Sequence, residues 1–324
     1  MSLQGSPAAG GPYVPGSSGG ALGQVMEPAM GLHAPRHGDH KKNFALGVLK
    51  ALFSERKARS GVIILLVFVL VAIFAPVLSP YSPTSTNFAR SASMNWAHPL
   101  GTTGSGQDAL SQLLYGTRIS LVVGLAAGAF ATATAVAIGV LAGYLRGVVE
   151  ETLGFIANLF LVIPTLPLMI VLAAYLPSRG VGTILFVVSI TGWAWGSRIM
   201  RSQTATLRSR DFVAAARLSG ESVPRIVFRE IMPNMVSLIA ANYFAAATAA
   251  VLAEAGLEFL GLGNPSTISW GTMLFWAENT NALLTGQWAL LFAPGLCIAL
   301  LATSFSLINF GIDALGNPRL REGK

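Results

Sequence analysis

The sequence predicts an all-α membrane protein with six transmembrane helices. Of its 324 residues, 53% are hydrophobic and only 11% are charged, less than half the charged share of an ordinary soluble protein. The mean hydropathy is +0.61, and the apolar residues are concentrated in long runs. Most runs are long enough to cross a bilayer core at about 1.5 Å per helical residue. The six predicted crossings are 62–78, 119–141, 154–175, 181–195, 235–253 and 290–310.

Positive charges are distributed unequally between the two sides that these crossings would create. With the first 60 residues placed inside, 18 of the 21 Lys and Arg fall on the inner side. The other side carries only Arg90, Arg118 and Arg179. Because inner loops are enriched in Lys and Arg, this bias predicts a multi-pass protein of the cell inner (plasma) membrane with both termini in the cytoplasm. This orientation explains the excess of positive charge, formally +7, so no nucleic-acid partner is expected.

The first 60 residues divide into two segments of different composition. Residues 1–40 are rich in Gly, Pro, Ser and Ala, which predicts a disordered cytoplasmic tail. Its histidines, His33, His37 and His40, are not held in a fixed geometry, so no metal site is expected. Residues 41–60 mix Lys and Arg with Phe and Leu, which predicts a basic amphipathic segment on the inner lipid surface. The first apolar run has no cleavage signature and is expected to stay as an uncleaved anchor.

Residues 61–118 are expected to hold the first transmembrane helix and an external loop. Pro80 and Pro83 prevent the helix from continuing, because proline removes a backbone donor and restricts the residue before it. Apolar positions with helical spacing follow Asp108. They predict a short external helix that ends before Arg118, at the boundary of the second crossing.

Glycines and prolines mark the next two crossings. The second crossing contains two small-xxx-small pairs, made by Gly124, Gly128, Gly139 and Gly143. Such pairs allow close helix packing. The third crossing contains Pro164 and Pro167 near its middle, where they free backbone carbonyls at bilayer depth. Two interpretations are open: a kink that improves packing, or a helix that lines a path.

The internal loop 201–234 is rich in Arg and contains helix start and stop signals. Asp211 can cap a helix that Gly220 would end in a left-handed conformation. Ser222 can cap a second helix that runs to Pro233. The predicted cytoplasmic helix-turn-helix is either a docking element for a partner protein or a basic loop held by anionic membrane lipid.

This loop resembles a motif of a known family. The run Ala-Ala-Ala-Arg-Leu-Ser-Gly at 214–220, followed by Ile-Met-Pro-Asn at 231–234, is similar to the EAA loop of ATP-binding-cassette (ABC) importer permeases. Ala214 stands where the family usually has Glu, and Met232 where it usually has Leu. The resemblance implies that the loop couples to an ATPase through Ala214, Ala215, Ala216, Arg217, Gly220, Ile231 and Pro233.

Three further stretches are similar to blocks of the dipeptide, oligopeptide and nickel permeases. They are 98–121, with His-Pro-Leu-Gly-Thr and Tyr-Gly-Thr-Arg-Ile-Ser-Leu; 254–271, with Glu-Ala-Gly-Leu-Glu-Phe-Leu-Gly-Leu-Gly; and 309–319. Gln107 and Glu258 stand where this family usually has Arg and Ser. The resemblance covers residues 62–319 and implies a type I ABC importer permease bundle. Its permease domain would be 119–311, with coupling loop 201–234 and a cytoplasmic tail at 312–324.

The resemblance implies a permease subunit that forms half of the path of an ATP-driven importer of di- or oligopeptides. Nickel and oligosaccharides remain alternatives, because related permeases serve them. The chain lacks a Gly-x-x-x-x-Gly-Lys-Ser/Thr phosphate loop, so neither ATP hydrolysis nor a cofactor is expected of it. The implied partners are a second homologous permease, two cytoplasmic ATP-binding subunits and an external solute-binding protein.

Two other classes of function agree less well with the sequence. An intramembrane enzyme would need a nucleophile with a base, or a metal cluster, inside the crossings. His98 is the only histidine outside the tail and lies in the external loop, so no catalytic residue is assigned. A self-sufficient secondary transporter would show two similar halves with paired ionisable sites, and no such repeat is present.

Glu254 is expected to be structural or gating. It lies near the external end of the fifth crossing, where an ionised carboxylate is costly unless it meets water or a polar partner. One interpretation places it at the headgroup interface, and the other on the inner face of the bundle with Tyr243, about three turns earlier on the same helix face. The candidates for a pathway or gate are thus Pro164, Pro167, Tyr243 and Glu254.

Overall fold

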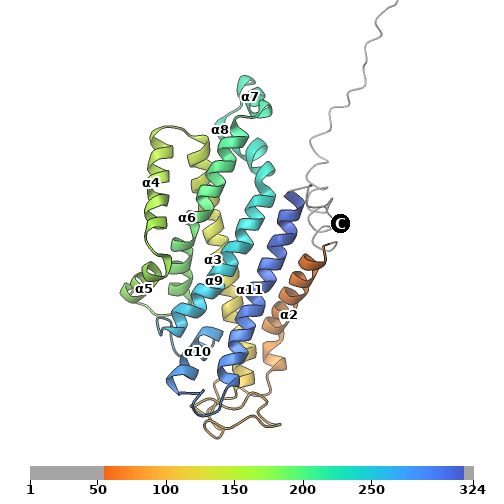
Figure 1. Ribbon diagram of the computed structural model, residues 1–324, viewed down its shortest axis with the longest axis vertical. Helices are drawn as coiled ribbons and strands as arrows, with labels where there is room; N and C mark the ends of the chain where they lie inside the picture. Colours follow the sequence, from red (N-terminus) through yellow and green to blue (C-terminus); the bar gives the residue numbers. More distant parts are fainter. Residues whose placement is uncertain (1–54, 317–324) are drawn as a thin grey trace, which may run out of the picture. The chain divides into compact units, whose positions relative to one another are not determined.

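The computed structural model describes residues 55–316, which form helices and loops without a β-strand. The predictions for the tail 1–40 with its histidines, for 41–54 and for 317–324 lie outside these residues. Figure 1 shows the long helices side by side in one bundle. In chain order, the helical elements of the described residues are α2 (Arg56–Leu78), α3 (Ala109–Tyr144), α4 (Val148–Val162), α5 (Thr165–Tyr175), α6 (Val181–Arg208), α7 (Asp211–Leu218), α8 (Val223–Ile226), η1 (Val227–Ile231), η2 (Met232–Met235), α9 (Val236–Phe259), α10 (Trp270–Asn279) and α11 (Ala289–Gly316).

Among the described residues, five helical stretches are long and apolar enough to cross a membrane, or six if α4 and α5 form one span. The predicted all-α membrane fold is therefore confirmed. The third crossing, however, is not one kinked helix, because α4 and α5 meet at 91°. Pro164 takes the N-cap position of α5, and Pro167 lies in its first turn, where a missing N–H removes no helical hydrogen bond. The two prolines separate two helices.

Helix α3 is longer than the sequence predicts. Its 36 residues include the segment expected to form a separate external helix, so that expectation was wrong. Asp108 caps the start of the helix, because its Oδ2 accepts a hydrogen bond from the Ser111 backbone N–H at 2.8 Å. Its other carboxylate oxygen, Oδ1, lies 2.8 Å from His98 Nδ1. Arg118 does not interrupt the helix, because its Nε–H donates to the carbonyl of Ala72 in α2 at 2.7 Å.

Helix α3 packs against α2, α4, α6, α9 and α10. Its glycines allow this close packing. A Cβ atom at Gly128 would lie 2.8 Å from the backbone nitrogen of Ala247 in α9, and one at Gly139 would lie 2.5 Å from the carbonyl oxygen of Ser197 in α6. The first small-xxx-small pair therefore packs on α9 and the second on α6.

Two predicted boundaries differ from the structure. Helix α2 begins at Arg56, so the last residues of the segment 41–60 belong to the first crossing. Helix α11 continues to Gly316, beyond the predicted end of the permease domain at 311. Helix α11 extends past residue 311 because it packs on α9, where Ile308 and Ile312 are both buried in a cluster with Ala241.

Replacing a contact glycine should cost more than replacing an open one. We expect Gly128→Ala to lower the thermal unfolding midpoint, because overpacking costs about 1–3 kcal/mol. Gly256→Ala is the matched control, since no atom lies within 4 Å of a Cβ there and alanine favours a helix. The midpoints are measured on protein purified in detergent. Equal midpoints for the two variants would contradict this account of α3 packing.

Candidate coupling segment and solute path

The candidate coupling segment is residues 211–235, formed by α7, a turn, and a helical run that enters α9. Figure 1 places α7 and α8 at one end of the bundle and α10 at the opposite end. Most residues implied by the family motif face outward. Ala214, Ala215, Arg217, Gly220 and Pro233 are exposed, and Ala216 is half-buried. Ile231 differs from them, because it is fully buried in the core.

Gly220 makes the turn between α7 and α8. Its φ of +75° lies in the left-handed region that glycine adopts without strain. The Gly220 N–H donates to the carbonyl of Arg217, and the Glu221 N–H donates to that of Ala216, which together form a Schellman motif. The predicted role of Gly220 as helix terminator is confirmed.

The predicted helix caps on either side of this turn are not formed. Arg210 takes the N-cap position of α7, and Asp211 lies in the first turn. There the carboxylate still has a favourable interaction with the positive end of the helix dipole. Ser222 takes the N-cap position of α8, but its side chain makes no capping hydrogen bond.

The helix after the turn does not stop at Pro233, as the sequence predicts. It runs through α8, the π turn η1 and the 3-10 turn η2 into α9. In a regular α-helix, proline clashes with the carbonyl four residues earlier. Here the chain widens to a π turn before the proline, with the Met232 N–H donating to the Val227 carbonyl, and the helical run continues. The coupling segment is thus continuous with the membrane-spanning α9.

A buried apolar cluster, which we call the anchor cluster, fixes the coupling segment to the bundle. It consists of Val140 and Tyr144 of α3, Met200 of α6, Val213 of α7, and Ile226, Ile231 and Met235 of the helical run. Burial of such a side chain contributes about 1.5–3 kcal/mol. The inner face of α7 is therefore held on α3 and α6, while its outer face stays exposed.

Tyr144 connects three helices at the edge of the anchor cluster. The Arg217 side chain of α7 lies over its ring at 5.1 Å, and the Arg208 side chain of α6 at 5.6 Å. The Arg217 Nε–H also donates to the Tyr144 hydroxyl at 3.4 Å. Sequence reasoning missed this residue, because Tyr144 lies 73 positions from Arg217 and belongs to no motif.

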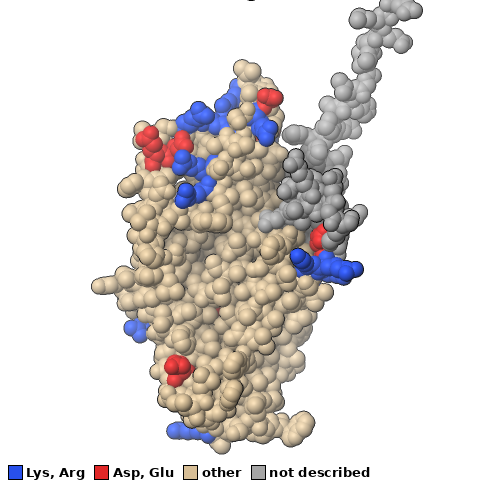
Figure 2. Space-filling view, in the orientation of Figure 1, with Lys and Arg blue, Asp and Glu red and all other residues tan. Residues whose placement is uncertain are grey.

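Arginines gather around the coupling segment. Figure 2 shows Lys and Arg side chains concentrated over the end that carries α7 and α8. In the described chain, Arg201 of α6 forms an ion pair with Glu150 of α4 at 2.9 Å. Such a surface favours a partner with acidic groups or anionic lipid headgroups.

A recess on the side of the bundle is the candidate solute path. It has a volume of about 190 Å³ and is lined mostly by apolar side chains, with Thr165 beside the α4–α5 break and Trp195 on α6. Trp195 also borders a second recess of about 400 Å³, together with Arg198. Arg198 in turn borders a third recess of about 580 Å³, together with Arg201. Helix α6 therefore borders three neighbouring recesses, of which the second and third are shallow and open, toward the arginine-rich end.

The prolines and tyrosine proposed for a gate lie in different surroundings. Pro164 and Pro167 are exposed at the break, next to Thr165, which lines the first recess. Tyr243 is half-buried, and its ring lies 5.1 Å from that of Phe244 in an edge-on contact. Tyr243 does not line the first recess, although Ala246, three residues later on α9, does.

Glu254 is fully buried near the end opposite α7. Its exposed fraction is 0%, so the carboxylate does not reach a headgroup interface, one of the two placements considered from sequence. Its Oε1 accepts a hydrogen bond from the Ser120 hydroxyl of α3 at 3.2 Å. Tyr243 lies eleven residues, or about 16 Å, earlier along the same helix, so these two candidates do not form one site.

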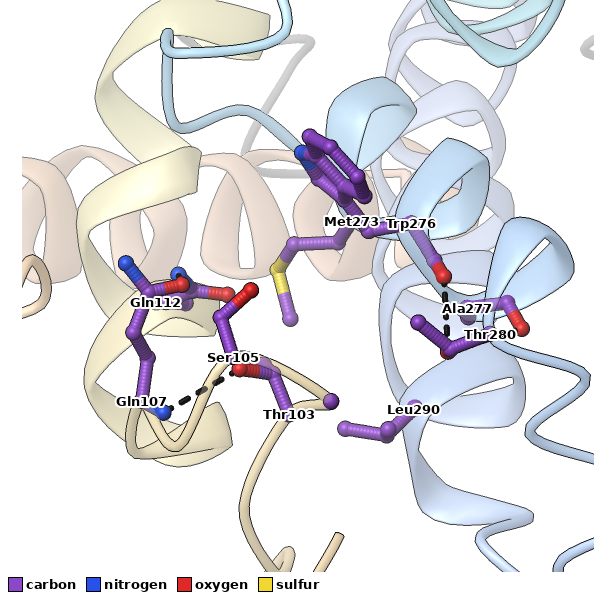
Figure 3. A pocket seen from close by; sticks show the side chains of 10 residues that line it. Thr103, Ser105, Gln107, Gln112, Met273, Trp276, Ala277, Thr280 and Leu290 are labelled. Atoms are coloured by element: carbon purple, nitrogen blue, oxygen red, sulfur yellow. Dashed lines mark hydrogen bonds between the residues drawn. The ribbon is translucent and has the colours of Figure 1, made fainter. Parts of the chain in front are cut away.

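A small pocket with a mixed polar and apolar lining lies between the loop 79–108 and α10, close to the opposite end of the bundle. Figure 3 shows Gln107 and Gln112 on one side of it and Trp276 and Thr280 on the other. Its volume of about 20 Å³ has room for one water molecule. The pocket therefore cannot hold a larger solute.

The Tyr144 contacts should hold α7 in place. Tyr144→Leu removes both the ring and the hydroxyl, so we expect faster trypsin cleavage at the arginines of the coupling segment. Tyr144→Phe is the matched control, because it keeps the cation–π contacts, each of which contributes about 0.5–1 kcal/mol at an exposed site. Cleavage is followed by mass spectrometry on purified protein. The same cleavage rate in Tyr144→Leu and the parent would contradict the role of this residue.

The chain has clear relatives over most of its length. Residues 135–322 match the family described as binding-protein-dependent transport system inner membrane component. Residues 46–97 match the N-terminal TM domain of oligopeptide transport permease C. Both matches agree with the resemblance noted in the sequence.

Individual proteins show the same relationship. The oligopeptide transport system permease protein OppC of Bacillus subtilis is 31% identical over 303 residues, covering 92% of this chain and 98% of the relative. The dipeptide transport system permease protein DppC of the same species is 32% identical over 278 residues, covering 84% and 85%. A probable peptide ABC transporter permease, y4tQ of Sinorhizobium fredii, is 35% identical over 251 residues, covering 77% and 84%. The chain therefore belongs to the binding-protein-dependent transport system inner membrane components, the multi-pass permease subunits of ABC importers, which are not themselves enzymes.

Proposed function

We propose that this permease forms half of the translocation path of an ATP-driven importer of di- or oligopeptides. The named relatives support the peptide class, because OppC and DppC are permeases of oligopeptide and dipeptide systems. A second homologous permease, two cytoplasmic ATP-binding subunits and an external solute-binding protein complete the assembly. Nickel and oligosaccharides are the alternative solutes.

One observation carries the coupling part of the proposal. The coupling segment has an exposed outer face on α7 and an inner face buried in the anchor cluster. A partner ATPase that binds the outer face would therefore move α3, α6 and α9 together with α7. This is a rigid-body transmission from the ATPase to the helices that line the candidate path.

The line of recesses along α6 supports a path on this side of the chain. A single permease leaves the recesses open on one side, and a second permease facing them would close them into a channel. The α4–α5 break, where residues 162–167 are exposed, places Thr165 next to the first recess. Non-helical backbone at membrane depth is tolerated where it lines a cavity or packs against protein. Pro164 and Pro167 are thus proposed to shape the path, in preference to the packing interpretation.

The proposal is tested at Gly220, where two substitutions differ only in backbone preference. No atom lies within 4 Å of a Cβ there, so neither side chain clashes. Gly220→Val should strain the left-handed turn by about 1–2 kcal/mol and displace α7, whereas asparagine tolerates this conformation. We expect Gly220→Val to lower peptide uptake and ATPase stimulation by up to about 30-fold, with Gly220→Asn close to the parent.

Both activities are measured on the complete transporter in proteoliposomes, with co-purification of all subunits as the control for assembly. If Gly220→Val assembles and couples like the parent, α7 is not the coupling element. If ATPase stimulation is normal but a labelled peptide is not taken up by the parent, the peptide assignment fails.

The orientation of the bundle is tested by cysteine labelling. We expect the end with α7 to be cytoplasmic, from the positive-charge bias. In a Cys297→Ala background, Leu284→Cys should react with a membrane-impermeant reagent in intact cells and Leu218→Cys only after permeabilisation. Both positions suit labelling, because Leu284 is 87% exposed and Leu218 is 91% exposed. The reverse pattern would contradict the orientation.

A further inference from the structure

Two buried carboxyl groups lie one helical turn apart near the end of α9. Glu254 is 0% exposed and Glu258 is 2% exposed. Their i, i+4 spacing places them on one face of the helix, one turn apart. Both lie at the start of α10, because Ser269 contacts Glu258 and Ser120, which contacts Glu254, accepts the Trp270 backbone N–H. Two ionised carboxylates at this distance, away from water, would repel each other strongly. The structure must therefore contain something that compensates this repulsion.

No cation does so within the described residues. The ion pairs of Arg201 with Glu150 and of His98 with Asp108 do not involve these two glutamates. The nearest Arg on α3, Arg118, points outward to the Ala72 carbonyl. The other titratable groups of the packed elements toward this end are Tyr115 of α3, Tyr175 of α5, Glu278 of α10 and Cys297 of α11. Among the described residues, the side-chain hydrogen bonds to the pair come from Ser120 and Ser269, and from none of these groups.

Hydrogen-bond donors around the pair are distributed unequally. Glu258 faces the start of α10 and accepts from the Ser269 hydroxyl, whose oxygen in turn accepts the Thr272 backbone N–H at 3.1 Å. The backbone of α10 approaches it closely, since a Cβ at Gly271 would lie 2.9 Å from Glu258 Oε2. A helix N-terminus with such donors stabilises an ionised carboxylate.

Glu254 has fewer donors. Its Oε1 accepts from the Ser120 hydroxyl, but its Oε2 has no donor and is fully buried. The single proton of each neighbouring hydroxyl is already used, by Ser120 for Glu254 and by Ser269 for Glu258. A buried acceptor without a donor, next to another acceptor, is satisfied if it carries a proton itself.

We propose that Glu254 and Glu258 bind one proton between them, carried by Glu254 Oε2 and donated to the ionised Glu258. This proton links α9 to the first turn of α10. The Ser120 hydroxyl oxygen also accepts a hydrogen bond from the backbone N–H of Trp270 at 3.4 Å, so the same network extends to α3. The proton is thus a structural ligand that fastens α10 to the bundle, at the end opposite the coupling segment.

Neutral replacements distinguish the two positions. Glutamine at 254 supplies an N–H donor to Glu258 and an acceptor for Ser120, so Glu254→Gln reproduces the protonated form. Glu258→Gln removes the anion and leaves the proton on Glu254. Glu278→Gln is the matched control, because Glu278 is an exposed carboxyl on the same α10.

The proton is detected directly by infrared spectroscopy on the purified complete transporter in lipid nanodiscs. The parent, Glu258→Gln and Glu278→Gln should show the carbonyl stretch of a buried protonated carboxyl, and Glu254→Gln should lack it. If the carbonyl band is present in Glu254→Gln and absent from Glu258→Gln, the proton is on Glu258, and its assignment to Glu254 is overturned. A band absent from the parent, or a bound metal ion found at the site by elemental analysis, would overturn the proposal.

Thermal unfolding tests the same idea without spectroscopy. The folded parent keeps a proton that the unfolded chain releases above about pH 4.3, so its unfolding midpoint should fall by several degrees more than that of Glu254→Gln as the pH is raised above this value. Glu278→Gln should follow the parent. Equal pH profiles for the parent and Glu254→Gln would contradict the proposal. This outcome is independent of peptide uptake, so it does not depend on the proposed transport function.

Discussion

The anchor cluster is the interaction on which the arrangement of the arginine-rich end depends. Helix α7 has only eight residues and cannot be stable alone in water. It is held because Val213 is buried against Val140 and Met200, which belong to two membrane-spanning helices. The Tyr144 contacts with Arg208 and Arg217 add a polar link at the edge of the cluster. An exposed helix thereby becomes a rigid extension of the bundle.

Helix α3 carries this constraint along the length of the bundle. Near the coupling segment its glycines lie against α6, in the middle they lie against α9, and at the opposite end Ser120 contacts Glu254. Close backbone contacts of this kind resist continuous deformation, so the helices are expected to shift as packed units. The proposed proton on Glu254 then fastens α10 to the same units. The two ends differ in chemistry, one apolar and arginine-rich, the other a buried polar network.

Patterns within a segment predicted much of this fold. The apolar runs gave the membrane-spanning helices, and Gly220 was recognised as a left-handed turn because its local signal is strong. The failures involve contacts between distant segments or backbone adjustments. The helix continues past Pro233 only because a π turn forms before it, which propensity does not indicate. The 91° break is not predictable from Pro164 and Pro167 alone, since the same residues are compatible with a kinked helix. The sequence indicates Glu254 as a candidate residue, but it does not indicate the hydrogen-bond partner Ser120, which lies 134 positions away.

The central claim is that α7 moves with α6 as one body, and a distance between the two helices tests it most directly. Spin labels at Leu218→Cys on α7 and Ala205→Cys on α6, both exposed, would be placed in the complete transporter with Cys297 replaced. Pulsed electron paramagnetic resonance then gives the distance between the two spin labels with and without ATP. The account predicts the same mean distance in both states. A shift larger than the width of the distance distribution would show that α7 moves independently of the bundle and would contradict it.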